Sequence, residues 1–210
     1  MPAAHPDPRG YPWPEPARPG VLGPAGFVED APDLQGRTPV VAVGSNASPT
    51  VLRAKLGGLL GTGLPMTLTR VEGLQVGHSA HVSARGYVAA APVRARPGTD
   101  VGAGTFVVCW FDEAQLARVD GTEPNYRRVR LDRTGERTAA QVYTSVHGVL
   151  GEGGTPLDLL DQGEVLGWLA ARLGPGLRED LDHRRLTDPA VRERVRAAMV
   201  EASLVIPAGW

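Results

Sequence analysis

The sequence contains very little cysteine and very little lysine. Cys109 is the only cysteine among 210 residues, which excludes a disulfide framework within the chain. Because Cys109 sits in the apolar run 104–111, we interpret it as a buried structural thiol rather than a nucleophile. Lys55 is the only lysine, and arginine supplies the rest of the 22 basic residues. We attribute this imbalance, together with the abundance of alanine and glycine, to coding bias.

Strong net charge and long apolar runs are also missing. The formal net charge is -1, which gives no electrostatic basis for a nucleic-acid or anionic-membrane partner. No apolar run approaches the roughly 20 residues of a membrane-spanning helix. The N-terminus lacks the basic-then-apolar order of a secretory signal. With 42% apolar and 21% charged residues the composition is that of a globular protein. We expect a cytoplasmic location. The sequence does not indicate whether the protein is a monomer or an oligomer.

Familiar phosphate, nucleotide and metal motifs are incomplete. Residues 44–48 lack the Gly-Lys-Ser/Thr ending of a P-loop and the second glycine of a serine nucleophile elbow. Residues 102–104 lie at the start of a predicted strand, whereas a dinucleotide-binding fingerprint follows one. His78 and His81 are three residues apart in predicted β structure, which sends them to opposite faces rather than to one metal ion. We therefore expect neither a metal nor another cofactor.

The first 37 residues form a proline-rich head. Ten of the 19 prolines fall within residues 1–39, and each removes a backbone donor, so we predict no regular structure here. Tyr11, Trp13 and Phe27 would allow the head to lie on the domain as an extended strap. We favour the alternative of a partly ordered tail.

The stretch 39–50 predicts a strand, a tight polar loop and a helix start. The apolar run 40–43 indicates a short buried strand, and Gly44 to Asn46 interrupt it with residues that tolerate left-handed backbone. Ser48 is the expected N-cap, with Pro49 in the first helical position. Backbone N–H groups at such a helix start can point at an anion.

The remaining pattern predicts an α+β fold in one domain, residues 38–210, with a mixed sheet that curls. We expect a sheet-rich core over 38–147 and C-terminal helices over 155–205. Strands are predicted over 66–76, 81–93, 101–111, 126–131 and 138–147, the last two forming a hairpin around 132–135. Helices are predicted over 50–60, 113–119, 157–173 and from Asp188 onward.

Two residues are candidates for chemistry by type. A Ser45 nucleophile would need a histidine base that sequence alone cannot place. Glu123 follows a predicted short helix, in a Gly/Pro loop between helix and strand, where a carboxylate is well placed to line a cleft. On spacing alone, a solvated loop acid is the preferred interpretation of Glu123.

Two motifs in this order resemble the gamma-glutamyl cyclotransferase superfamily. Members usually carry Tyr-Gly-Ser-Asn after a hydrophobic strand, and later Leu-x-x-Leu-Asp-x-x-Glu, then a Tyr and a basic residue. Here residues 43–46 read Val-Gly-Ser-Asn, and residues 116–123 read Leu-Ala-Arg-Val-Asp-Gly-Thr-Glu. The small-residue run 86–90 matches a strand between the two motifs. The resemblance covers about residues 38–147, with these positions in register: Gly44, Ser45, Asn46, Asp120, Glu123, Tyr126 and Arg127.

The resemblance implies a β-barrel-like curled sheet with a cavity between the Gly-Ser-Asn loop and the acid. It also implies a cyclising transferase or lyase, in which the amine of a γ-glutamyl compound attacks its own γ-carbonyl to give 5-oxoproline and a free amine. Glu123 would be the general acid/base. Backbone N–H groups of Gly44, Ser45 and Asn46 would hold the substrate carboxylate or the developing oxyanion, with Val43 and Tyr126 beside them. The implied partner is a small molecule with a γ-glutamyl or similar carboxylate/amine group, and no cofactor is needed.

The chain departs from the family pattern at two positions. Val43 replaces the usual tyrosine and removes a hydroxyl, and Pro124 replaces the glycine that commonly follows the acid. Two alternatives therefore stay open: a non-catalytic carboxylate-binding protein of the same fold, and an unrelated α+β protein that uses the Trp13 head as an interaction arm. A cavity shared by Glu123 and the Ser45 loop would favour the enzyme and the carboxylate-binding protein over the unrelated α+β protein.

Overall fold

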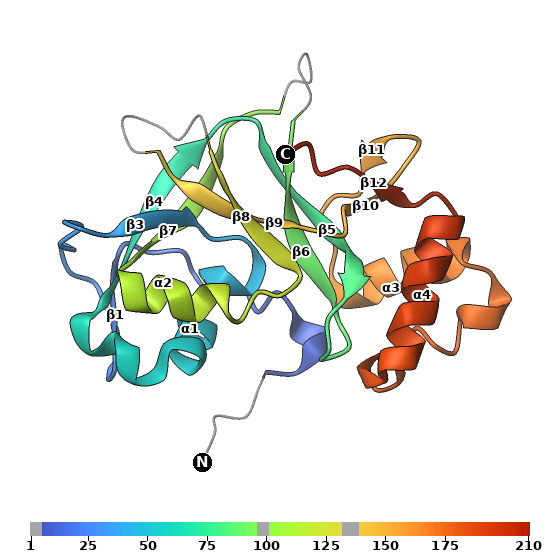
Figure 1. Cartoon of the computed structure of the whole chain (residues 1–210), viewed down its shortest axis with the longest axis horizontal. Coiled ribbons are helices and arrows are strands. Elements are labelled where there is room, and N and C mark those ends of the chain that lie inside the picture. The colour runs from blue at the N-terminus through green and yellow to red at the C-terminus, as the bar shows by residue number, and fades with distance from the viewer. Residues whose placement is uncertain (1–5, 96–100, 132–138) are drawn as a thin grey trace.

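The structure is a computed structural model that describes residues 6–95, 101–131 and 139–210, and it contains two β-sheets flanked by helices (Figure 1). The larger sheet has the order β2-β1-β4-β7-β3-β9-β8, and in the smaller sheet β11, β10, β5 and β6 follow one another while β12 pairs with β10. The described strands do not close into a barrel, because β2 and β8 are free edges of the larger sheet. The predicted α+β class is confirmed, with open sheets.

Strand β3 (Thr38–Val41) lies in the interior of the larger sheet, as the apolar run at its C-terminal end predicts. It pairs antiparallel with β7 (Gly104–Phe111) and parallel with β9 (Gln141–Ser145). Cys109 faces Val40 across the first of these pairs and is 1% exposed. Burial raises the pKa of the Cys109 thiol to about 12, so an unreactive structural thiol is the interpretation that fits.

Helices α1 (Pro49–Leu56) and α2 (Glu113–Asp120) begin where the sequence predicts. Ser48 caps α1 by accepting the Val51 N–H at 3.2 Å, with Pro49 in the first helical position. Asp112 and Gln115 form a reciprocal capping box at the start of α2. A single 3-10 turn, η2 (Gly44–Ala47), connects β3 to α1. The two helices pack against each other beneath the larger sheet (Figure 1).

Two of the predicted strands are interrupted by turns that contain a glycine. The expected single strand over 66–76 is wrong: β4 (Leu64–Val71) ends at a turn containing Gly73, whose φ is +65°, and β5 (Leu74–Val82) follows. The expected strand over 81–93 is also wrong, because Gly86, with φ +79°, lies in a turn before β6 (Val88–Arg94). A positive φ at glycine lets the chain reverse direction where a strand would otherwise continue.

The predicted hairpin after α2 is confirmed by β8 (Tyr126–Arg130), which pairs antiparallel with β9. Its predicted turn at 132–135 lies outside the described residues. Two longer helices, α3 (Gln162–Arg172) and α4 (Pro189–Glu201), cover the smaller sheet and share a second core with β5 and β6. The remaining strands of this sheet are short: β10 (Val149–Glu152), β11 (Thr155–Pro156) and β12 (Val205–Ile206). In the part of the chain that the structure describes, no helix combines the length and apolarity that membrane crossing requires.

The proline-rich head contains regular structure, contrary to our prediction. Strands β1 (Gly20–Gly23) and β2 (Gly26–Val28) form a hairpin, and β1 extends the larger sheet by pairing with β4. The prolines permit this because Pro19 and Pro24 lie outside the strands, where no ladder N–H is needed. The favoured partly ordered tail is therefore wrong for residues 6–28, which lie on the domain as a strap; the domain boundary near residue 37 stays a prediction.

Candidate functional site

A cavity of about 210 Å³ lies where η2, α1, the α2–β8 loop and the head converge. Of the predicted site residues, Val43, Ser45, Asn46, Glu123 and Tyr126 line it together, so Glu123 and the Ser45 loop do share a cavity. Gly44 is adjacent and does not line it. The other lining side chains used below are those of Tyr11, Trp13, Lys55, His81, Arg85 and Tyr87.

Glu123 is held by a tight turn that follows directly on α2. The Thr122 N–H donates to the Val119 carbonyl at 2.8 Å, the Glu123 N–H donates to Asp120 at 3.2 Å, and the Tyr126 N–H donates back to the Glu123 carbonyl at 3.0 Å. Pro124, which replaces the family's usual glycine, sits within this turn and fixes one more backbone angle. The carboxylate thereby has a defined position at the cavity wall, with its side chain 13% exposed.

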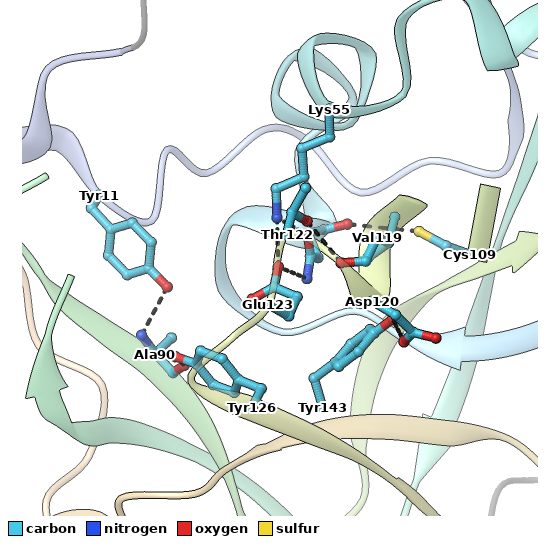
Figure 2. Close-up of polar contacts among 11 residues, drawn as sticks. Tyr11, Lys55, Ala90, Cys109, Val119, Asp120, Thr122, Glu123, Tyr126 and Tyr143 are labelled. Atoms are coloured by element: carbon cyan, nitrogen blue, oxygen red, sulfur yellow. Dashed lines mark hydrogen bonds and ion pairs between the residues drawn. The ribbon is translucent and has the colours of Figure 1, made fainter. Parts of the chain in front are cut away.

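One carboxylate oxygen of Glu123 is bound twice. Its Oε1 accepts from Asn46 Nδ2 at 3.0 Å and from Lys55 Nζ at 2.6 Å (Figure 2). Lys55 Nζ also donates to Asn46 Oδ1 at 2.7 Å, which closes a three-residue network. Among the described residues no hydrogen bond reaches Glu123 Oε2. The solvated loop acid that spacing favoured is therefore wrong; the acid is a half-enclosed ion-pair partner.

Lys55 is the site residue that sequence reasoning missed. It lies in the last turn of α1, where an amphipathic pattern makes a lysine look like an ordinary surface residue. Its side chain is only 18% exposed, because the turn carrying Glu123, 68 residues further on, packs over it. The one signal in the composition is that Lys55 is the only lysine in a chain whose other basic residues are all arginines.

Asp120, the other acid of the second motif, is engaged in anchoring the fold. It accepts from Arg128 Nε at 2.9 Å and Nη2 at 2.8 Å, and from the Tyr143 hydroxyl at 2.7 Å. Partial burial raises the pKa of Asp120, but the bonds from Arg128 and Tyr143 outweigh it and leave the pKa below its usual range. Asp120 thus ties the end of α2 to β8 and β9. Arg127 points away from the cavity, donating to the Trp210 carbonyl at 3.2 Å.

The hydroxyl groups of two tyrosines form hydrogen bonds with the backbone of Ala90 at the cavity wall. The Tyr126 hydroxyl donates to the Ala90 carbonyl at 2.8 Å, and the Tyr11 hydroxyl accepts the Ala90 N–H at 2.8 Å (Figure 2). Burial raises the pKa of both phenols above their usual range, so both stay protonated. Tyr126, predicted to bind substrate, presents its ring rather than a free hydroxyl to the cavity.

Gly44 makes room for the head. Its φ is +62°, and a Cβ there would lie 2.5 Å from the Tyr11 hydroxyl oxygen. Val43, which replaces the family's usual tyrosine, packs against the same cluster of aromatic and small residues. The Tyr11 hydroxyl therefore lies directly beside this loop, although Tyr11 comes from a distant part of the chain.

A carboxylate of the chain itself, that of Glu15, binds at the N-terminus of α1. Glu15 Oε1 accepts from the Ser48 hydroxyl and from the Thr50 N–H, the latter at 3.1 Å. Our expectation that this helix start offers its N–H groups to a ligand is wrong at Thr50, because the head already occupies it. The N–H groups of Gly44 to Asn46 as ligand donors stay a prediction.

His81 also lines the cavity. Its Nδ1 lies 2.5 Å from Ser79 Oγ, which lies 2.7 Å from Ser145 Oγ. Burial, followed by the positive environment of His147 and Arg196, lowers the pKa of His81 to about 3, so the ring is neutral at ordinary pH. No group of three or more His, Cys, Asp or Glu side chains suited to a metal ion occurs among the described residues.

The chain matches no protein-family model and no curated protein. Two solved structures resemble it over 53% of its length and 68% of theirs, each at 13% sequence identity. One is the uncharacterized protein loc79017 from Homo sapiens, with a TM-score of 0.43. The other is a protein named gamma-glutamyl cyclotransferase, with a TM-score of 0.42. The likeness concerns the fold over about half of the chain, and we draw the function from the geometry of the site instead.

Proposed function

We propose that the protein is a cyclotransferase-type enzyme that converts a γ-glutamyl amide into 5-oxoproline and a free amine. The observation that supports this is the asymmetry of Glu123: its Oε1 is held by Asn46 and Lys55, while its Oε2 takes no hydrogen bond from the described residues. A carboxylate fixed through one oxygen and open through the other is suited to proton transfer with a bound ligand.

In the proposed reaction the substrate's α-amine attacks its own γ-carbonyl carbon. Glu123 Oε2 takes the proton that the attacking amine must lose, and the carbonyl becomes a tetrahedral oxyanion. Glu123 then returns the proton to the amide nitrogen, the carbon–nitrogen bond breaks, and the amine leaves. Because both reacting groups belong to one molecule, much of the entropic barrier is absent, and positioning with one base suffices.

Lys55 has a defined part in this proposal. An ammonium group carries three N–H donors, and two of them point to Glu123 and Asn46. The third is available to the substrate's α-carboxylate or to the oxyanion, where a cation in a partly enclosed site is most effective.

The test is 5-oxoproline release from a panel of γ-glutamyl amides, with Glu123→Gln as the decisive variant. Gln keeps the shape and the contact with Asn46 but cannot take a proton, so we expect turnover to fall by about 100-fold or more. Glu113→Gln is the matched control, since Glu113 is exposed on the adjacent helix and makes no contact with the cavity. Unchanged turnover in the Glu123 variant would remove it from the proposed role.

A non-catalytic carboxylate-binding function is the second candidate, and the 2.6 Å contact between Lys55 and Glu123 favours it, because this contact already engages the carboxylate as an ion-pair partner. Under that reading, γ-glutamyl compounds raise the melting temperature without yielding 5-oxoproline. A cytoplasmic setting, for either function, stays a prediction.

A further inference from the structure

The head contributes an aromatic wall to the cavity. We define this wall as Tyr11, Trp13 and Tyr87, all of which line the cavity. The Tyr11 and Tyr87 rings are stacked with centroids 4.2 Å apart, and Trp13 meets both edge-on at 5.1 and 5.4 Å. Tyr11 is buried, whereas Trp13 and Tyr87 keep exposed area. The wall is therefore a built cluster with accessible ring surface.

The head is bound to the domain at two points and braced by one hydrogen bond within itself, so the wall has a defined geometry. The Tyr11 hydroxyl accepts from Ala90, the Trp13 indole N–H donates to the Asp7 carbonyl at 2.7 Å, and Glu15 binds the start of α1. Trp13 also has a φ of +54°, a left-handed conformation that is strained for a bulky residue. Such a conformation persists only where the surrounding contacts determine it, so the contacts of Trp13 hold its indole at the cavity wall.

The cavity thus has two unlike halves. Asn46, Lys55 and Glu123 form a polar half suited to an amino-acid head group, and the aromatic wall forms the other half. The volume, about 210 Å³, is below the roughly 300 Å³ at which sites for drug-sized ligands begin. Arg85 lies beside Tyr87 and also lines the cavity, so a cationic substituent would meet a like charge there.

We propose that the aromatic wall is the subsite for the group attached to the substrate's amide nitrogen, and that it selects a flat, uncharged amine such as an aryl or benzyl amine. The identity of the head group rests on the proposed function above; the subsite rests on the ring geometry. Aromatic contacts contribute about 1 kcal/mol beyond burial, which corresponds to roughly five- to tenfold in affinity.

Binding is measured by calorimetry on the Glu123→Gln protein, which holds ligands without turnover, using three probes: γ-glutamyl anilide, γ-glutamyl methylamide and a γ-glutamyl diamine. We expect the anilide to bind at least fivefold more tightly than the methylamide and the diamine to bind most weakly. Trp13→Ala should reduce the anilide preference to less than twofold. Trp168→Ala is the matched control, because Trp168 stacks on Arg172 at 4.1 Å on α3 and does not line the cavity.

Circular dichroism checks that each variant is folded, and Tyr87→Leu tests the same wall at the one ring that does not belong to the head. Equal binding of anilide and methylamide, tightest binding of the diamine, or an equal loss of both ligands in Trp13→Ala and Tyr87→Leu would overturn the subsite. Anilide preference without any 5-oxoproline from the wild-type protein would leave the subsite standing and remove the cyclotransferase activity. The two proposals therefore fail separately.

Discussion

The ion pair between Lys55 and Glu123 makes a quantitative prediction about stability. The two charges are 2.6 Å apart at their nearest atoms, with side chains 18% and 13% exposed. At an effective dielectric constant of about 20 their attraction is on the order of 5 kcal/mol. Desolvation and side-chain ordering offset most of this, so we expect a coupling free energy of about 1–2 kcal/mol.

The perturbation is a double-mutant cycle. Lys55→Met should lower the free energy of unfolding by about 2 kcal/mol, because Glu123 is left charged with Asn46 as its one remaining partner in the network. Glu123→Gln should lower it by about 1 kcal/mol. The double variant should be destabilised by less than the sum, since neither charge then remains unpaired. Urea denaturation at pH 7 measures all four proteins by linear extrapolation.

The matched control is the pair formed by Arg18 and Glu29, which has a contact of 2.7 Å but side chains 56% and 62% exposed. Its coupling should stay below about 0.5 kcal/mol and vanish in 0.5 M salt, because water and ions screen it. The coupling between Lys55 and Glu123 should persist in that salt. Additive free energies for Lys55 and Glu123, to within about 0.3 kcal/mol, would refute the reasoning.

Three further predictions concern His78, Gly44 and Cys109. His78 Nε2 accepts the Leu160 N–H at 2.9 Å, and burial lowers the pKa of His78 from 6.5 to about 4. The contribution of His78 to stability is therefore complete above about pH 6.5 and is lost as the pH falls towards 4. The stability advantage of the wild-type protein over His78→Gln should shrink by up to about 1.4 kcal/mol per pH unit in that window, and a difference in unfolding free energy that stays constant with pH would contradict this. Gly44→Ala should lower the free energy of unfolding by about 2 kcal/mol or more, and by less in a Tyr11→Phe background, because the clashing hydroxyl is then gone; equal losses in both backgrounds would exclude that clash. The Cys109 thiol, with a pKa of about 12, should resist alkylation at pH 8 until denaturant unfolds the protein, and rapid labelling of the native protein would show that the thiol is accessible.

The local signals in the sequence predicted local structure well. Ser48 begins the helix that it was expected to cap, because an N-cap depends only on the few residues after it. The apolar run 104–111 became strand β7 for a similar reason: a continuous β-branched and aromatic stretch packs well between neighbouring strands. The cavity shared by Glu123 and the Ser45 loop was also anticipated, through the family resemblance.

The parts that depend on distant contacts were not predictable in this way. Lys55 reads as a surface residue within α1, and only the turn of Glu123 packing over it makes it a site residue. The head was judged by its proline count, although its prolines fall outside the strands β1 and β2. That Glu15 occupies the start of α1 follows from the path of the head across the domain, which no local pattern contains.

The path of the head has a consequence for how proteins of this kind can diverge. The polar side chains of the cavity, Asn46, Lys55 and Glu123, come from α1, the turn before it and the α2–β8 loop, whereas two of the three rings of the aromatic wall belong to the head. Residues 11–13 lie outside every strand of both sheets. Tyr11 is a buried core residue, whereas Trp13 is half-buried, so a substitution at Trp13 changes the wall without altering the residues around Glu123.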